Sequence, residues 1–459
     1  MPGLTAELGR FVAGLEPASL PTAAHRTVRR GIVDCMGVLF AGRGEPVVRQ
    51  VLSTLSVSAN AGGSSVLGDR GYAASSEAAF VNSVAAHALD YDDTGLDGHP
   101  SVVLAPVVLA EGERSGATWL EAGAAYVAGY EVWAELIARD PDKHHGKGWH
   151  PTAVFGTVAA AAASARLRGL TAERCAAALG IAASMAGGLV ANFGSMTKPL
   201  QVGLAARNGI AAACYAEHGI TAAPDALESP RGFLAALSPG GRVRLGGPIG
   251  AGSVWQIVAQ GLNIKRYPVC YAVHRTIDAA LELRARLDQR LGEIEAIEVS
   301  MGRLQAAMLR NSRPRTGLEA RFSAEFAVAC ALLHGHVGLA DLDDARVSEE
   351  DIQRLQGRVQ VLPLQEQDAE EPLFSPFDTV RVRFRDGESI AATPVHRAKG
   401  HASLPLTDVE LQAKFLDCGR SQLGDAAALA WWQALWAAPA DSTLSWANQG
   451  RANVGPLTG

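Results

Sequence analysis

Carboxyl and imidazole side chains are concentrated in the segment His87–His99, which reads HALDYDDTGLDGH. Four aspartates lie between two histidines, directly after an alanine- and valine-rich run that is typical of a helix. So many acids at one helix end cannot all be buried and charged without partners, because desolvation disfavours an ionised carboxyl group. The segment is therefore a candidate site, in which an aspartate orients a histidine or acts as a base.

Three further segments place a cation or a histidine beside glycine or proline in apolar surroundings. Each lies at a predicted helix start or domain junction, where backbone N–H groups and the helix dipole favour an anion. These segments are Gly-Trp-His-Pro-Thr (148–152), Met-Thr-Lys-Pro-Leu (196–200), and Lys-Arg-Tyr-Pro (265–268) followed by His274.

The same residues also allow interpretations in which they have no catalytic role or bind a metal ion. Asp92 and Asp93 fit a helix cap and a turn, so we leave both out of the catalytic set. A lone histidine is more often a hydrogen-bonded structural residue than a catalyst. Asp90 and His99 together with these two aspartates also suit a hard cation, as in a metal hydrolase, although we predict no metal ligands.

Composition limits the class of protein. The chain has 459 residues, 48% of them hydrophobic, which is enough for a large core and for two domains. The formal charge of -6 is spread without long single-sign runs, which argues against a nucleic-acid partner. The six cysteines show no Cys-x-x-Cys spacing and are predicted to be reduced core residues.

The N-terminus lacks a basic segment followed by an apolar run, so we expect a cytoplasmic protein. Residues 176–197 are uncharged over the length of a membrane span but consist mostly of alanine, glycine and serine. We predict a buried helix there, broken at Gly187-Gly188, and no membrane partner.

Apolar residues recur at helical spacing through most of the chain, with few strand signals before residue 290. Ser76, Thr118, Thr152 and Thr171 are candidate N-caps. Helices are predicted at 5–15, 23–40, 47–55, 77–88, 102–113, 118–137, 152–166, 171–186, 200–217, 324–333, 408–416 and 425–438, and strands at 294–301, 358–362, 379–384 and 389–393.

The order of these elements predicts a mainly α protein. An all-helical domain is formed by both chain ends, residues 1–262 and 401–459, and a smaller α+β lid domain, residues 263–400, is inserted between them. Clefts between domains are favoured ligand sites.

Five motifs in this order resemble the MmgE/PrpD family, which includes 2-methylcitrate dehydratase, cis-aconitate decarboxylase and iminodisuccinate epimerase. Residues 414–418, Lys-Phe-Leu-Asp-Cys, resemble its closing helical segment. The motifs are HALDYDDT (87–94), GHPS (98–101), GWHPT (148–152), MTKPL (196–200) and Tyr-Pro-x-Cys-x-x-x-His (267–274).

The resemblance implies a homodimer that acts on small di- or tricarboxylates without a metal or cofactor. Asp90 and His274 are the expected proton-transfer pair, whereas Thr94 and His99 hold or polarise the substrate. The expected carboxylate-binding residues are His150 and Lys198, with Lys265 and Arg266 adding charge at the lid hinge.

One residue departs from the family pattern. Gln201, which we expect to bind substrate, stands where many relatives are expected to have histidine. The histidine's hydrogen-bond donor or proton carrier is then lost, which leaves the substrate open. The leading prediction is a dehydratase of a 2-methylcitrate-like tricarboxylate. An epimerase or racemase of an iminodisuccinate-like dicarboxylate, a cis-aconitate decarboxylase and a non-catalytic, carboxylate-binding helical dimer are the alternatives.

Overall fold

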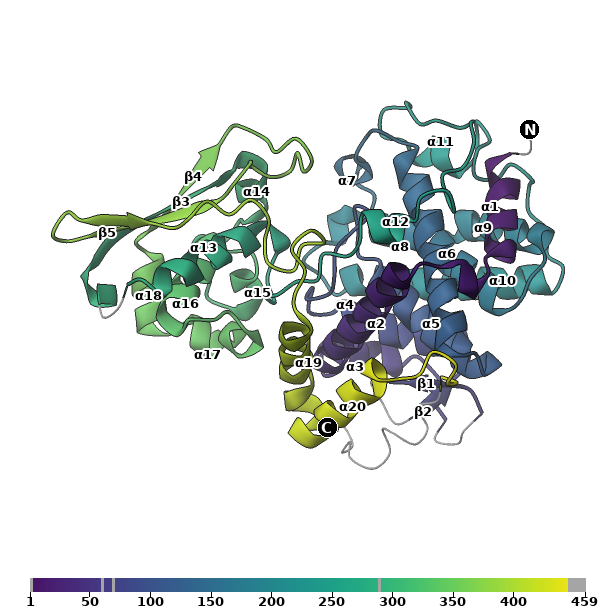
Figure 1. The fold of residues 1–459 in the computed structure, drawn as a ribbon, viewed down its shortest axis with the longest axis horizontal. Helices are drawn as coiled ribbons and strands as arrows, with labels where there is room; N and C mark the ends of the chain where they lie inside the picture. Colours follow the sequence, from purple (N-terminus) through teal and green to yellow (C-terminus); the bar gives the residue numbers. More distant parts are fainter. Residues whose placement is uncertain (1–2, 59–61, 68–70, 288–289, 445–459) are drawn as a thin grey trace. The chain divides into compact units, whose positions relative to one another are not determined.

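The computed structural model describes residues 3–58, 62–67, 71–287 and 290–444. The chain divides into two compact units (Figure 1). The helical unit comprises Met1–Asn263 and Val409–Gly459, and the inserted unit comprises Ile264–Asp408. The sequence places the corresponding boundaries at 262/263 and 400/401. The predicted mainly α composition is confirmed.

Helices form nearly all of the helical unit. In chain order they are α1 (Leu4–Gly14), α2 (Thr22–Gly42), α3 (Pro46–Leu52), α4 (Ser75–His87), α5 (Ser101–Ser115), α6 (Trp119–Ala138), α7 (His144–Lys147), α8 (Pro151–Leu167), α9 (Ala172–Met185), α10 (Thr197–Glu217), α11 (Phe233–Leu237), α12 (Gln256–Ala259), α19 (Asp408–Leu423) and α20 (Asp425–Trp436).

Helix α8 lies at the centre of this unit, where it packs against α5, α6, α9 and α10. It is rich in alanine and buried along nearly its whole length. Small side chains allow the neighbouring helices to approach closely: a Cβ added at Gly209 of α10 would lie 2.3 Å from the Cβ of Ala160. Close packing of this kind holds the helix ends at fixed positions.

Two of the four predicted N-caps are confirmed. Thr118 forms a capping box with Glu121, and the Thr171 side chain accepts a hydrogen bond from the backbone N–H of Arg174. The other two predictions are wrong. Ser76 lies inside α4, and Thr152 is the second residue of α8, where its hydroxyl accepts a hydrogen bond from the backbone N–H of His99 instead.

The helical unit is not all-helical, which corrects the sequence prediction. Strands β1 (Ser64–Val66) and β2 (Gly71–Ala73) pair antiparallel, with Ser64 opposite Ala73. Strands of three residues are too short to show the alternation on which a sequence-based assignment depends.

The segment 176–197 was also predicted only in part. Helix α9 ends at Met185, before the expected break at Gly187-Gly188, but the residues that follow are exposed or half-buried rather than in the core. Within the described ranges, no helix is both long and apolar enough to cross a membrane.

The inserted unit contains a four-stranded sheet with the order β4-β3-β5-β6. Its strands are β3 (Ile294–Gly302), β4 (Val359–Leu364), β5 (Thr379–Phe384) and β6 (Ser389–Ala391). Strand β4 runs parallel to β3, whereas β5 runs antiparallel to β3 and to β6.

Helices α13 (His274–Arg284) and α16 (Ala324–His334) contact each other and the sheet, and lie on one side of it in Figure 1. The sequence did not predict α13. The remaining short helices of this unit are α14 (Arg303–Met308), α15 (Gly317–Ala320), α17 (Asp344–Val347) and α18 (Glu350–Gln356).

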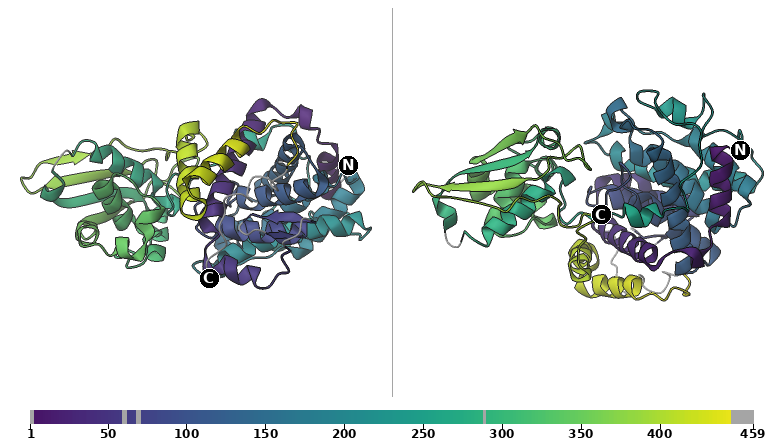
Figure 2. Two further views of the ribbon diagram at one scale, coloured as in Figure 1. Left: turned by 90° about the horizontal axis from the view of Figure 1, so that it is seen from below. Right: turned by 45° about the horizontal axis from the view of Figure 1, so that its top comes forward.

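The C-terminal helices return to the helical unit, where α20 contacts α2 (Figure 2). Trp431 and Trp432 are buried, and the Trp431 ring lies 5.2 Å from that of Phe40. The six cysteines form no disulfide within the described residues; Cys214 and Cys270 are half-buried and the other four are in the core.

Candidate active site

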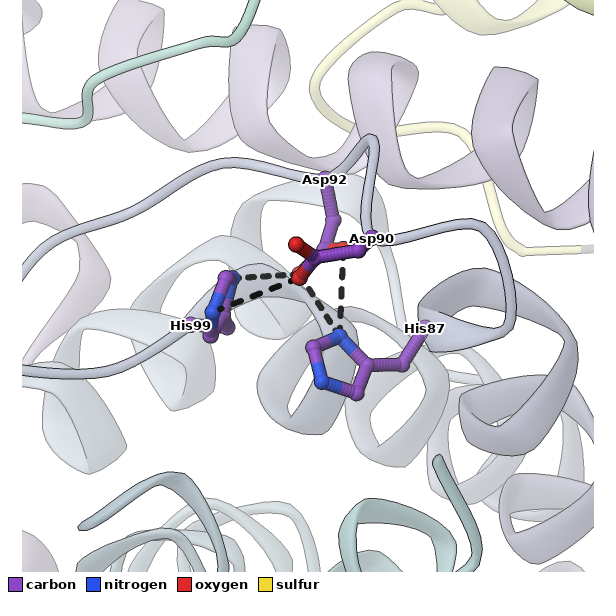
Figure 3. Close-up of side chains that lie close together, drawn as sticks. All are labelled: His87, Asp90, Asp92 and His99. Carbon is purple, nitrogen blue, oxygen red and sulfur yellow. Dashed lines mark hydrogen bonds and ion pairs between the residues drawn. The ribbon is translucent and has the colours of Figure 1, made fainter. Parts of the chain in front are cut away.

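The ends of four packed helices meet at the candidate site in the helical unit. Helix α4 ends at His87, α5 begins two residues after His99, α8 begins directly after His150, and the first turn of α10 carries Lys198 and Gln201. The pairs α4 and α5, α5 and α8, α8 and α10, and α4 and α10 are each in contact. Figure 3 shows the innermost side chains, which come from the end of α4 and the loop that follows it.

The loop between α4 and α5 has an unusual backbone. Asp90, Leu96 and Asp97 have positive φ angles of 54°, 51° and 57°, a region that residues other than glycine rarely adopt. Such residues persist only where surrounding contacts hold them, and they cluster at functional sites. The loop is held by the Trp133 indole, which donates to the carbonyl of Leu96 over 3.1 Å, and by reciprocal backbone hydrogen bonds of 2.9 Å between Thr94 and Asn263.

Asp92 is the centre of the cluster. Its buried carboxylate lies 3.1 Å from Nδ1 of His87 and 2.8 Å from Nδ1 of His99 (Figure 3). Burial alone would raise the pKa of Asp92, but the two imidazoles hold it well below its usual range. Asp92 is therefore ionised and orients both rings. The sequence favours a turn or cap role for Asp92, whereas in the structure its carboxylate joins the two histidines of the cluster.

His87 is the neutral partner of Asp92. Burial lowers the pKa of His87 to about 4, against the opposing effect of the Asp92 carboxylate. The neutral ring therefore donates its Nδ1–H to Asp92. Its Nε2 is buried and has no hydrogen-bond partner among the described residues. His87 was also missed as a site residue; its signal in the sequence is a histidine at a helix end, five residues before an aspartate.

Asp90, Lys198 and His99 form the accessible part of the cluster. The Lys198 ammonium lies 2.6 Å from a carboxylate oxygen of Asp90, which is 3.8 Å from Nε2 of His99. The side chain of Asp90 is 20% exposed, and those of Lys198 and His99 are each 15% exposed. The side chains of His87 and Asp92 are fully buried. A ligand would therefore meet a carboxylate, an ammonium and an imidazole, supported from beneath by Asp92.

The charge of Lys198 affects whether a metal ion could bind at the cluster. His87, Asp90, Asp92 and His99 each offer one ligand atom, all within 4.8 Å of one another. The ammonium group already supplies a positive charge at Asp90. A metal ion at this cluster would have to compete with that charge.

His150 is held in one tautomer by Gln201. The Gln201 amide donates to the carbonyl of Leu189 over 3.2 Å, which turns its oxygen towards Nδ1 of His150 at 2.8 Å. His150 therefore donates from Nδ1, and its buried Nε2 has no hydrogen-bond partner in the described structure. Burial lowers the pKa of His150 to about 2, so the ring is neutral. Its ring stacks against that of His87 at 6.2 Å.

Backbone pairing fixes the position of His150. Its N–H donates to the carbonyl of Gly188 over 3.0 Å, and the N–H of Val190 donates to that of Gly148 over 2.9 Å. Gly188 has a φ of 150°, and a Cβ there would lie 2.6 Å from the Cβ of Ala153. The glycines that the sequence marks as a helix break therefore allow the chain to pass close to His150.

Asp93 has a structural role at the start of α5. Its carboxyl group accepts hydrogen bonds from the backbone N–H and the hydroxyl of Ser101, and that hydroxyl lies 2.7 Å from the hydroxyl of Tyr126. Burial raises the pKa of Asp93 to about 8. Asp93 therefore contacts the first residue of α5, whereas the N-cap residue of this helix is Pro100.

Three predicted site residues belong to the inserted unit. His274 is the buried first residue of α13, with its ring against Tyr267. Lys265 is also buried, and Arg266 pairs with Asp278 at 3.7 Å. Their participation, like the pairing of His274 with Asp90, stays a prediction. Thr94 belongs to the helical unit and is half-buried. It directly follows Asp93 in the sequence, and its backbone pairs with that of Asn263.

The fold and the site define an enzyme, with acid, base and cationic groups gathered on packed helix ends. The chain belongs to the MmgE/PrpD family: residues 6–245 match the MmgE/PrpD N-terminal domain and residues 267–437 match the C-terminal domain. The family resemblance inferred from the motifs is confirmed.

Three relatives carry the same description, cis-aconitate decarboxylase. The chain is 29% identical over 432 residues to that of Mus musculus, with 90% of this chain and 86% of the relative covered. It is 29% identical over 426 residues to that of Homo sapiens, with 90% and 87% covered. It is 27% identical over 427 residues to that of Aspergillus terreus, with 85% and 84% covered.

Proposed function

We propose that the chain is a lyase that removes carbon dioxide from a small unsaturated tricarboxylate of the cis-aconitate type. Two findings support the proposal: the description shared by its relatives, and the group formed by Asp90, Lys198 and His99 at the helix ends. Dehydration of a 2-methylcitrate-like acid, which the sequence favoured, is the second candidate.

The surroundings of the cluster suit an anionic substrate. Helices α5, α8 and α10 each begin at the site, and a helix N-terminus carries a partial positive charge. Lys198 adds a full positive charge on a half-buried side chain. A substrate carboxylate that displaces Asp90 from this ammonium would gain a charge-assisted hydrogen bond. This arrangement is the observation that carries the proposal.

Decarboxylation needs a proton donor at carbon. When the carboxylate leaves as carbon dioxide, the electron pair of the broken C–C bond moves onto carbon and shifts the double bond, and a proton then adds to the carbon that becomes negative. His99 is the proposed acid, because Asp92 holds its Nδ1 side and its Nε2 faces the accessible part of the cluster. Lys198 would hold a carboxylate that stays on the substrate.

Dehydration would use the neutral histidines differently. Removing a proton from carbon requires a base with a free electron pair, and the Nε2 atoms of His150 and His87 have no hydrogen-bond partner in the described structure. This observation keeps dehydration as a candidate. His274, Lys265 and Arg266 stay predicted contributors, and assembly as a homodimer stays predicted with them.

A substrate panel distinguishes the candidates. The purified protein is incubated with cis-aconitate, 2-methylcitrate, citrate and iminodisuccinate, and products are followed by NMR and mass spectrometry. We expect carbon dioxide and an unsaturated dicarboxylate from cis-aconitate. Loss of water from 2-methylcitrate or inversion of iminodisuccinate, without decarboxylation, would replace the proposal by dehydration or epimerisation.

A pair of matched variants tests the site. Asp90→Asn is expected to lower kcat/KM by about 10²-fold or more, because Asp90 lies 3.8 Å from Nε2 of the proposed acid His99 and can return the proton to it; general acid–base groups contribute about 10² to 10⁴. Asp97→Asn is the control: it lies in the same loop, has a similar positive φ, and pairs with Lys143 at the surface. Equal activity of the two variants would remove Asp90 from the mechanism.

A further inference from the structure

A second cluster of metal-ligand side chains lies in the inserted unit, at the C-terminal end of α16. Cys330 and His334 lie one turn apart on this helix, which ends at Gly335 with a φ of 75°. His336 and Asp341 follow within a few residues, Asp341 in the 3₁₀ helix Leu339–Leu342. The family motifs and the proposed function use none of these residues.

The donor atoms point towards one another. The Cys330 sulfur lies 3.6 Å from Nδ1 of His334, and this nitrogen lies 3.0 Å from one oxygen of Asp341. One ligand atom from each of the three residues lies within 4.8 Å of the other two. Nδ1 of His336 lies 2.8 Å from the second oxygen of Asp341.

Two of these separations are close to those around a tetrahedral zinc ion. Bonds of about 2.3 Å to sulfur and about 2.0 Å to nitrogen or oxygen, at the tetrahedral angle, place donor atoms roughly 3.3 to 3.6 Å apart. The Cys330–His334 distance lies at the upper end of this range, and the His334–Asp341 distance is a few tenths of an ångström below it. Small movements would therefore fit an ion.

The surrounding groups also suit metal ligation. Nε2 of His334 lies 3.9 Å from a carboxylate oxygen of Glu349, which is too long for a hydrogen bond; a small approach of this side chain would supply the outer carboxylate that a metal-bound histidine usually has. The backbone N–H of Gly338 donates to Asp341 over 2.7 Å and orients its carboxylate. Cys330 and Asp341 are buried, whereas the His336 side chain is 63% exposed, so an ion has a path from solvent.

We propose that Cys330, His334 and Asp341 bind a transition metal ion, with Zn²⁺ as the best match, and that the ring of His336 rotates to supply a fourth ligand. One sulfur, two imidazole nitrogens and one carboxylate oxygen favour Zn²⁺ over the hard cations Mg²⁺ and Ca²⁺, which prefer oxygen ligands. The ion would join the end of α16 to the following loop and stabilise the inserted unit.

Cobalt titration tests the proposal without reference to activity. The full chain is treated with a chelator, and Co²⁺ is added while the absorption spectrum is recorded. A tetrahedral site containing Cys330 should give a thiolate-to-cobalt charge-transfer band at one equivalent, and Zn²⁺ should then displace Co²⁺. The cluster around Asp92 contains no sulfur, so it cannot give this band.

Three variants make the result specific. Cys330→Ser should abolish the charge-transfer band, and His336→Ala, a change at an exposed side chain, should weaken Co²⁺ binding by 10-fold or more. Cys214→Ser is the matched control, because Cys214, Glu217 and His218 form another group of potential ligands, in the helical unit. This variant should bind Co²⁺ as the unaltered chain does.

Thermal unfolding gives a second measurement. Zn²⁺ should raise the melting temperature of the unaltered chain and of Cys214→Ser but not that of Cys330→Ser. The proposal is overturned if the unaltered chain shows no charge-transfer band, or if the band persists in Cys330→Ser. Neither outcome affects the proposed lyase activity, which rests on other residues.

Discussion

The protonation states at the site follow from its hydrogen bonds. Asp92 is ionised because two imidazoles surround it, whereas His87 and His150 are neutral because they are buried. Asp92 fixes the tautomer of His87, and Gln201 fixes that of His150. In both rings Nδ1 carries the proton and Nε2 keeps its electron pair. Both rings therefore hold a buried acceptor nitrogen in a defined orientation behind the accessible group of Asp90, Lys198 and His99.

Gln201→Glu should change how activity depends on pH. A carboxylate beside Nδ1 stabilises the protonated ring, so the pKa of His150 should rise from its present value of about 2. If His150 acts as the base, as in the dehydration candidate, it must stay neutral, so the acidic limb of the kcat/KM profile should move to higher pH; an unmoved limb would favour the decarboxylation in which His99 is the acid. The pH profiles of both proteins, measured with the substrate identified in the panel, provide the comparison.

Gln201→Leu supplies the matched control. It removes the acceptor without adding a charge, so kcat/KM should fall about 10- to 100-fold, the usual effect of losing such an orienting partner. The acidic limb should then stay where it is in the unaltered chain. If both variants lose activity equally with no shift in the limb, Gln201 is only a packing residue.

The packing of helix α10 against helix α8 determines where Lys198 and Gln201 lie. Both residues are on the first turn of α10, and α8 begins beside His150. Because α10 packs closely against α8, a shift of either helix would move the ammonium and the amide relative to that ring.

Gly209→Ala should destabilise the chain. The added Cβ would lie 2.3 Å from the Cβ of Ala160 and 2.7 Å from the backbone nitrogen of Ala161, so the helices would have to separate. Overpacking of this kind costs about 1 to 3 kcal/mol. Urea unfolding followed by circular dichroism should show a lower midpoint, and activity should fall as the first turn of α10 moves.

Gly123→Ala is the control for this change. Gly123 is also buried inside a helix, α6, but a Cβ there would have its nearest neighbour at 3.8 Å, an ordinary contact. Replacing a helical glycine by alanine without a clash stabilises by roughly 0.5 to 1 kcal/mol. Similar losses of stability in the two variants would contradict the role assigned to the α8–α10 contact.

Across the whole molecule, a buried ion pair joins the two ends of the chain within the helical unit. The Lys414 ammonium on α19 lies 2.6 Å from a carboxylate oxygen of Asp34 on α2, and it donates to the carbonyl of Tyr91 over 2.9 Å. Tyr91 lies between Asp90 and Asp92. The C-terminal segment therefore supports the loop that carries the site.

Lys414→Met should be strongly destabilising. Removing one partner leaves the other charge buried without compensation, which costs about 3 to 5 kcal/mol. In the double variant Asp34→Asn, Lys414→Met no charge remains, so much of this stability should return. Urea unfolding of the two single variants and the double variant measures the coupling; a double variant as unstable as the sum of the singles would contradict it.

Activity should behave differently from stability in these variants. The double variant restores a neutral interior but not the hydrogen bond to the carbonyl of Tyr91, so its kcat should stay below that of the unaltered chain. Full activity in the double variant would show that the site loop keeps its conformation without Lys414.

The sequence alone determined the long helices, the regular strands of the inserted unit and the family. Apolar spacing over many residues is a local property, so α2, α6 and α8 are predicted to within one or two residues. The motif residues are likewise local in sequence. The residue types singled out the segments that carry Asp90, His99, His150 and Lys198, and the resemblance to the family then singled out these residues within them.

Only the tertiary structure decided what these residues do together. The sequence favoured a turn or cap role for Asp92, whereas its burial and its contacts with His87 and His99 place it at the centre of the cluster. From the sequence, a proton carrier is lost at Gln201. Its contact with His150, 51 positions away, shows instead that Gln201 fixes the tautomer of that ring. Burial, charge pairing and tautomers depend on long-range packing, which residue types and spacing in one sequence do not determine.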